Sequence, residues 1–329
     1  MIEDQSAQQY ILLAENSSGH SSHSAADVQP KDAINSYLST VSDHRTLSFF
    51  HYKIADLPVI IYDKQAGLHV YSDINSMEQE GLFTEVGEQI VHKSNTAEAV
   101  SFDASITSLV CFEWIAMLLG IIFFAVAGHR AKKRPLTPPR GIQNMLEAVV
   151  GFIKNQVIAP NCPAKVTEKL QHYFYALFFF ILICNLVGLV PGGHAATGSI
   201  ATTLALAVIA FFVINITSMV EGGVGKWFKS LLGGAPWPLA FIMVPIEIIS
   251  LFTKPFALTI RLFANMTAGH VVLLSLIGLT IVMQSYVMAG VSVAFSVFML
   301  ALELLVAFLQ AYIFTILTAV FTGLAVGEH

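Results

Sequence analysis

Long apolar stretches fill the last two thirds of the 329-residue chain. Runs of about 20 apolar residues are long enough to cross a bilayer core of roughly 30 Å as helices. The pattern predicts five spans, at residues 105–127, 173–190, 199–220, 241–283 and 291–324. An amphipathic stretch at about 141–158 is expected to lie along the membrane interface. The predicted fold is therefore an all-α polytopic membrane protein.

The last two apolar stretches are longer than a bilayer requires. Residues 241–283 would form a helix of about 65 Å at 1.5 Å per residue, and residues 291–324 are similarly overlong. Such helices must tilt steeply or bend, and Pro245 and Pro255 are candidate bend points. We expect a long, strongly tilted helical hairpin that lies against a partner surface.

The first 103 residues predict an extramembrane extension. The segment up to about residue 45 is rich in Ser, Gln and His, and this composition is typical of disorder. Residues 46–74 contain two β-rich runs separated by a turn-like stretch between Tyr62 and Leu68, which predict a small β-hairpin. Nothing in residues 1–103 resembles a catalytic constellation.

Charge is scarce and unevenly distributed. Only 12% of the residues are charged, whereas soluble domains have about a quarter. Residues 1–103 contain 15 acidic and 5 basic side chains, and the remainder contains 7 and 12. A basic cluster at 130–134 follows the first span, and the predicted outer turns at 191–198 and 284–290 contain no Lys or Arg. By the positive-inside rule, the N-terminus lies outside and the C-terminus inside.

Ionisable side chains inside a membrane cost about 2.5–3.5 kcal/mol each at a helix centre, so each one invites a functional explanation. Glu247, Lys254 and Arg261 are spaced by seven residues and therefore share one stripe of their helix. Asn265 lies on the same face as Arg261. An arginine keeps its proton at physiological pH, so Arg261 is predicted to act as a fixed positive charge and not as a proton carrier. Because no carboxylate lies within four residues, its partner must come from another helix or another chain.

Titratable side chains form a second candidate site on the hairpin. His270 is nine residues beyond Arg261 and points to a different surface. On the following helix, Glu303 and Gln310 are seven residues apart and share a face. We expect His270 and Glu303 to meet, and burial brings such groups into a useful titration range. A fixed charge flanked by titratable groups is typical of a proton path with a barrier.

Four further polar residues are supporting candidates with two interpretations each. Lys254 can simply extend to the lipid headgroups, and Glu247 can pair with it instead of serving transport. Glu113, the only charged residue of its span, can be functional or can reach the interface. Asn185 is expected to make a helix–helix hydrogen bond in preference to binding a substrate.

The remaining composition excludes several site classes. The three cysteines lack the spacing of a zinc site or a disulfide framework. No Walker motif or Gly-rich phosphate loop is present, so the chain has no P-loop ATP site. The sequence predicts no cofactor and no nucleic-acid partner.

The segment LFTKPFALTIRLFANMTAGH, residues 251–270, resembles the signature of the a subunit of rotary F-type ATP synthases. NLVGLVP at 185–191, PIEIIS at 245–250 and LQAYIFTILTAVF at 309–321 are similar to the same family. The resemblance covers roughly residues 105–329. It implies a proton-channel stator subunit with c-ring subunits, b-type peripheral stalk subunits and other ATP synthase subunits as partners. It also implies an energy-transducing membrane, either a bacterial inner membrane or a mitochondrial inner membrane.

Carried onto this sequence, the resemblance makes Arg261 the stator arginine that faces the c-ring and separates two half-channels. Asn265 and Gln310 would flank it, and His270 with Glu303 would form the acid–base pair of one half-channel. Two alternatives remain. A self-contained proton-coupled secondary transporter would carry solute by itself, and a structural membrane scaffold would tolerate neutral replacements of Arg261 and Glu303.

Overall fold

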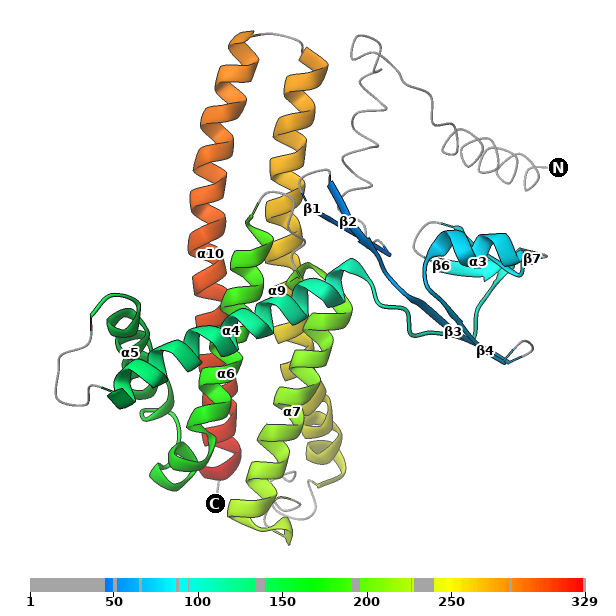
Figure 1. Ribbon diagram of the computed structural model, residues 1–329. Helices are drawn as coiled ribbons and strands as arrows, with labels where there is room; N and C mark the ends of the chain where they lie inside the picture. Colours follow the sequence, from blue (N-terminus) through cyan, green and yellow to red (C-terminus); the bar gives the residue numbers. More distant parts are fainter. Residues whose placement is uncertain are drawn as a thin grey trace.

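The computed structural model describes residues 45–49, 52–64, 67–86, 89–93, 95–133, 140–190, 196–225, 227, 240–283 and 286–327. The segment predicted to be disordered therefore lies outside the described residues, apart from Arg45. Small strands come first along the chain and long helices follow (Figure 1).

Among the described residues, eight short strands and one helix, α3, precede the first long helix. They form a β1–β2 pair, a sheet in the order β4–β3–β8 and a sheet in the order β5–β6–β7, all antiparallel. The bounds are β1 (Thr46–Phe49), β2 (Tyr52–Asp56), β3 (Val59–Asp63), β4 (Gly67–Tyr71), α3 (Ile74–Glu80), β5 (Phe83–Val86), β6 (Gln89–His92), β7 (Asn95–Ala99) and β8 (Phe102–Asp103).

The predicted β-hairpin is confirmed by β3 and β4. Tyr62 lies opposite Leu68 across the pair, so the turn falls where the sequence indicated. Alternation decides which side of β3 is buried, because successive side chains of a strand point to opposite faces. Val59 and Ile61 are fully buried with Met77 of α3, whereas Tyr62 is exposed. This region therefore has a small hydrophobic core of its own.

An arginine ties the two sheets of this region together. Arg45 is 4% exposed and forms ion pairs with Glu85 of β5 and, at 2.6 Å, with Asp103 of β8. Burial alone would raise the pKa of Asp103, but hydrogen bonds from Ser105 and Arg45 outweigh it and lower the pKa below the ordinary 3.8. The two carboxylates thus compensate the charge of the buried guanidinium within one folded region.

The described helical part contains five helices that are long and apolar enough to cross a membrane. In order, the helical elements are α4 (Ser108–Lys133), α5 (Ile142–Phe152), the π-helix η1 (Ile153–Ile158), α6 (Ala164–Gly188), the 3₁₀ helix η2 (Ala196–Gly198), α7 (Ile200–Gly222), α9 (Ala240–Met283) and α10 (Tyr286–Gly327). The predicted all-α polytopic fold is correct for the membrane part. The helix α6 begins at Ala164, before the predicted span at 173–190, because its first turns are polar and fall outside the apolar pattern.

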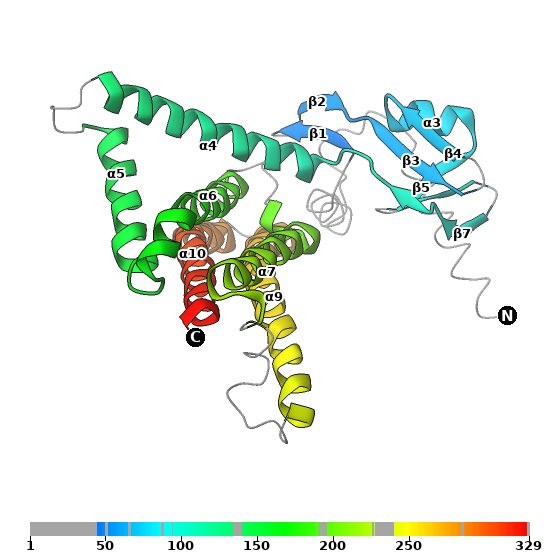
Figure 2. The same ribbon diagram turned by 90° about the horizontal axis from the view of Figure 1, so that it is seen from below.

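The helices α6, α7, α9 and α10 pack against one another, and α4 crosses this bundle and contacts α6 (Figures 1 and 2). The long helices α9 and α10 run side by side as the predicted hairpin. Only 11% of the apolar window of α10 is buried within the chain. Most of its apolar surface is therefore left for lipid or for other subunits.

One end of the bundle is closed by a tight contact between α10 and the turn after η1. A Cβ atom at Gly323 would overlap the backbone carbonyl of Asn161, so only glycine permits this approach. The Cys162 thiol donates to the Ala319 carbonyl at 3.4 Å, and the Ser218 hydroxyl of α7 donates to the Ala325 carbonyl at 2.6 Å. These contacts hold α10 in a defined register against its neighbours.

Candidate functional site

Two of the polar residues predicted for the hairpin, Asn265 and Gln310, meet between α9 and α10. The side-chain amide of Asn265 on α9 donates to the Gln310 carbonyl oxygen on α10 at 2.8 Å. Gln310 is 3% exposed, and its own amide nitrogen has no partner among the described residues. This bond fixes the register of the two long helices at the level of the predicted site.

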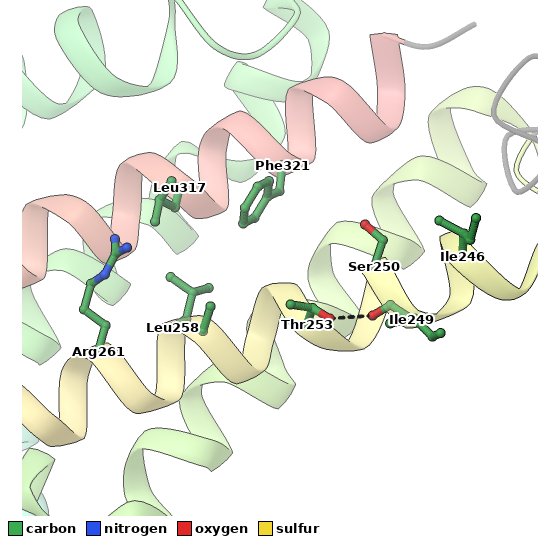
Figure 3. A pocket seen from close by; sticks show the side chains of 9 residues that line it. Ile246, Ile249, Ser250, Thr253, Leu258, Arg261, Leu317 and Phe321 are labelled. Atoms are coloured by element: carbon green, nitrogen blue, oxygen red, sulfur yellow. Dashed lines mark hydrogen bonds between the residues drawn. The ribbon is translucent and has the colours of Figure 1, made fainter. Parts of the chain in front are cut away.

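Arg261 lies one helical turn before Asn265 and is exposed. It lines a pocket of about 510 Å³ between α9 and α10, together with Leu258, Leu317 and Phe321. Figure 3 shows the Arg261 side chain extending from α9 toward α10. Among the described residues, the structure shows no carboxylate paired with Arg261. Its positive charge therefore stands without a counter-charge in the described part of the chain.

The pocket continues from Arg261 along α9 toward the start of that helix. Ser250 and Thr253 contribute hydroxyl groups to its wall, and Ile246 lies at its far end (Figure 3). The Thr253 hydroxyl donates to the Ile249 carbonyl at 2.8 Å and so stays close to its own helix. The wall is therefore mainly apolar, with a few polar groups and one cation.

Glu303 of α10 is held against a glycine of α9. It is 9% exposed, and neither carboxylate oxygen has a hydrogen-bond partner among the described residues. A Cβ atom at Gly269 would overlap the carboxylate and would lie 3.0 Å from its Cδ atom. The absence of a side chain at Gly269 thus makes room for a buried carboxyl group that has no hydrogen-bond partner among the described residues.

Asn185 of α6 makes the helix–helix hydrogen bond that the sequence indicated. Its amide donates to the Ala307 carbonyl of α10 at 3.2 Å, one turn beyond Glu303. Its oxygen accepts from the Thr197 hydroxyl of η2 at 2.6 Å, and both side chains are buried. The two polar residues lie next to the segment of α10 that bears Glu303 and Gln310.

Glu113 of α4 is hydrogen bonded to a neighbouring helix. Its carboxylate accepts a hydrogen bond from the Thr202 hydroxyl of α7 at 2.5 Å. This contact joins the helix that crosses the bundle to one of the helices within it.

The side chains of Glu247, Lys254 and His270 lie outside the described side chains, although their backbone belongs to α9. The expected pairing of Glu247 with Lys254 and the meeting of His270 with Glu303 therefore stay predictions. The described neighbour of His270, Gly269, is close enough to Glu303 that an added Cβ atom would overlap its carboxylate.

Sequence reasoning missed Gly269, Thr197 and Thr202. A glycine within a long apolar helix is a possible signal of close packing, and Gly269 directly precedes His270. The two threonines carried no signal. Thr197 falls in the predicted outer turn at 191–198, and the partner of Thr202, Glu113, is 89 residues away in the sequence.

Comparisons with known proteins agree on a family. The sequence model described as ATP synthase A chain matches residues 110–323, which is more than half of the chain. The protein named ATP synthase subunit a from Pelodictyon phaeoclathratiforme is 39% identical over 318 residues, which cover 96% of this chain and 89% of that protein. This similarity therefore extends into the N-terminal region that the family model leaves out.

Other relatives match a shorter part of the chain. ATP synthase subunit a 2 from Chlorobaculum tepidum is 47% identical over 230 residues, which cover 69% of this chain and 65% of that protein. ATP synthase subunit a 2 from Prosthecochloris aestuarii is 50% identical over 230 residues, covering 69% of this chain and 71% of that protein. The chain thus matches about two thirds of the length of these two relatives.

Proposed function

We propose roles for the polar residues of α9 and α10 from one premise: the chain belongs to the ATP synthase A chain family, the proton-translocating subunits of the membrane sector. The α9–α10 hairpin faces a ring of c subunits. Protons cross the membrane in two half-channels that end at this interface, and Arg261 separates them. The host membrane is a bacterial inner membrane, with the N-terminal region outside and the C-terminus inside.

The unmatched charge of Arg261 is the observation that carries this proposal. A cation in a membrane helix is costly unless an anion compensates it. Since the described residues supply no carboxylate to Arg261, the counter-charge comes from a c subunit that passes in front of it. The guanidinium keeps that carboxylate ionised at close range and repels protons, so no proton can pass directly between the half-channels.

The outer half-channel ends at Glu303. The carboxyl group is buried beside Gly269, has no hydrogen-bond partner among the described residues, and lies next to the helix position of His270. A carboxyl group in such a place can accept a proton and pass it on, because no donor or cation among the described side chains holds it in one state. Gln310 and Asn265 then lie between this group and Arg261 along the hairpin.

The inner half-channel follows the pocket on the other side of Arg261. The pocket is about 510 Å³ in volume, which is room for water, and Ser250 and Thr253 supply hydroxyl groups along it. Glu247 belongs to the same stretch of α9. Protons released from the c-ring leave along this wall, while Lys254 extends toward the headgroups.

The exposed apolar surface of α4 is assigned to the peripheral stalk. Only 11% of its apolar window is buried within the chain, and it lies at the side of the bundle (Figure 2). The membrane helices of b-type subunits are the partners that this surface would bind, while α9 and α10 face the c-ring.

The test is an Arg261→Ala variant of the assembled ATP synthase in inverted membrane vesicles. We expect complete loss of ATP-driven proton pumping with all subunits still co-purifying, because only the fixed charge has been removed. Lys169→Ala is the matched control, since its ammonium group pairs with Glu221 at the end of α7, and it should pump normally. Normal pumping by Arg261→Ala would contradict the proposal. Proton-coupled solute uptake by the chain alone would instead favour a self-contained transporter.

A further inference from the structure

Glu113 is a carboxylate in a membrane helix, and it has no role in the half-channels proposed above. It lies five residues after the start of α4, about 8 Å along the helix at 1.5 Å per residue. The side chain is partly exposed, and its hydrogen-bond partner, Thr202, lies in the first turn of α7. In the proposed orientation both residues are near the outer surface, where protons enter.

A continuous set of contacts leads inward from Glu113. One turn further along α4, Ala116 packs with Cys184 of α6 and Ala196 of η2 in a small buried cluster. These two residues are the sequence neighbours of Asn185 and Thr197, which hydrogen bond to each other at 2.6 Å. The 3₁₀ helix η2 touches α4, α6, α7 and α9. The Asn185–Thr197 pair therefore lies beside the turn of α4 that follows Glu113.

The Asn185–Thr197 pair also contacts α10, the helix that bears Glu303 at the inner end of this route. Asn185 donates to the Ala307 carbonyl, and Glu303 lies one turn earlier on α10. Threonine hydroxyl and asparagine amide groups can each donate and accept hydrogen bonds, so they can orient water molecules between two acids. The line from Glu113 through Thr197 and Asn185 to Glu303 thus joins four polar residues from four different elements.

We propose that Glu113 is a second proton-carrying carboxylate, at the mouth of the outer half-channel. The inference rests on the proposed function, because it needs Glu303 to receive the proton. In each cycle the Glu113 carboxylate takes one proton from a hydronium ion at the outer surface and forms an O–H bond. It then releases that proton to water held by Thr197 and Asn185 and returns to the carboxylate form. The Thr202 hydroxyl orients one oxygen, and the other oxygen exchanges the proton.

A purely structural role predicts different behaviour. In that case the Glu113–Thr202 bond would only hold α4 against α7, and any acceptor at position 113 would serve. Among the described residues, the Cys184 thiol of α6 is a titratable group that interacts with Glu113. A Cys184→Ser variant is therefore needed to show that the thiol is not the carrier.

The experiment measures proton flux through the assembled complex in vesicles as the outer pH is raised. Glu113→Gln keeps an oxygen that accepts from Thr202 but cannot carry a proton, so flux should fall several-fold, and most where protons are scarce. Glu113→Asp should restore much of the flux. Thr202→Val should lower it less than Glu113→Gln, and Cys184→Ser should leave it unchanged.

Two results would overturn the inference. Wild-type flux in Glu113→Gln at every pH would show that position 113 needs only a hydrogen-bond acceptor. Loss of co-purifying subunits in Glu113→Gln but not in Arg261→Ala would show that Glu113 serves assembly. Failure of the proposed function is distinguishable, because Arg261→Ala would then still pump whatever the result at Glu113.

Discussion

Arg45 in the strand region and Arg261 in the helical region differ in whether a carboxylate pairs with them. Arg45 is 4% exposed and is paired with Glu85 and Asp103 of the strand region. Arg261 is exposed on α9 and has no carboxylate partner among the described residues. A charge satisfied within its own region stabilises that region, whereas a charge left unmatched in a membrane helix is available to another molecule.

The apolar side chains of the two regions differ in the same way. Val59 and Ile61 are fully buried in the strand region, which is the pattern predicted for an extramembrane region in water. On α9 and α10, Phe241 is 88% exposed and Val297 is 64% exposed. In a bilayer such exposure costs nothing, because lipid tails are as apolar as the side chains. The strand region also exposes Leu68 and Val70, so its apolar side chains divide between a buried and an exposed face. The difference teaches that the strand region has a core of its own, whereas most of the apolar surface of the hairpin is left for lipid or for other subunits.

Adding a methyl group at Gly269 tests whether proton flux requires the space that this glycine leaves for the Glu303 carboxylate. In Gly269→Ala the new Cβ would overlap the carboxylate and displace it, so proton flux should fall several-fold. The helix itself should remain stable, since alanine favours a helix by about 1 kcal/mol over glycine. The measurement is ATP-driven pumping in vesicles. Gly290→Ala is the control, because a Cβ atom there meets nothing within 4 Å; equal pumping by both variants would show that Glu303 tolerates displacement.

Replacing Arg45 tests how much its two ion pairs stabilise the strand region. Arg45→Met removes the cation and leaves Glu85 and Asp103 unpaired, which should lower the unfolding free energy of the strand region by about 1–3 kcal/mol. Hydrogen–deuterium exchange of the β3, β5 and β8 amides in the intact complex would measure this loss. Lys53→Met is the control, since the Lys53 side chain is 54% exposed beside Asp56 and the effect should be below about 1 kcal/mol.

Acid should weaken the strand region through Asp103. Its folded-state pKa is lowered from the ordinary 3.8, despite burial, by hydrogen bonds from Ser105 and Arg45. The resulting stabilisation is therefore fully present above about pH 4 and is lost as the pH falls through the lowered pKa. Exchange protection of β3 and β8, corrected for intrinsic rates, should fall over that window. Asp103→Asn should remove this part of the pH dependence, and an unchanged profile in that variant would assign the effect to other groups.

Much of this protein was predictable from the order of its residues. Apolar runs predicted the five long helices, since a hydrophobic stretch of bilayer length has few alternatives to a helix. Two β-rich runs on either side of the turn-like stretch between Tyr62 and Leu68 predicted the β3–β4 hairpin. The seven-residue spacing placed Glu303 and Gln310 on one face of a helix, and the motif around Arg261 indicated the family that the comparisons then showed.

Contacts between distant segments were decided only by the tertiary structure. The Asn265–Gln310 bond, the space that Gly269 leaves for Glu303 and the Thr202–Glu113 bond each join different helices. Helical periodicity reports which residues share a face, but it does not report which face of another helix lies opposite or how closely two backbones approach. The sequence by itself therefore determined the helices and the unmatched cation, and packing decided which polar groups lie within reach of one another.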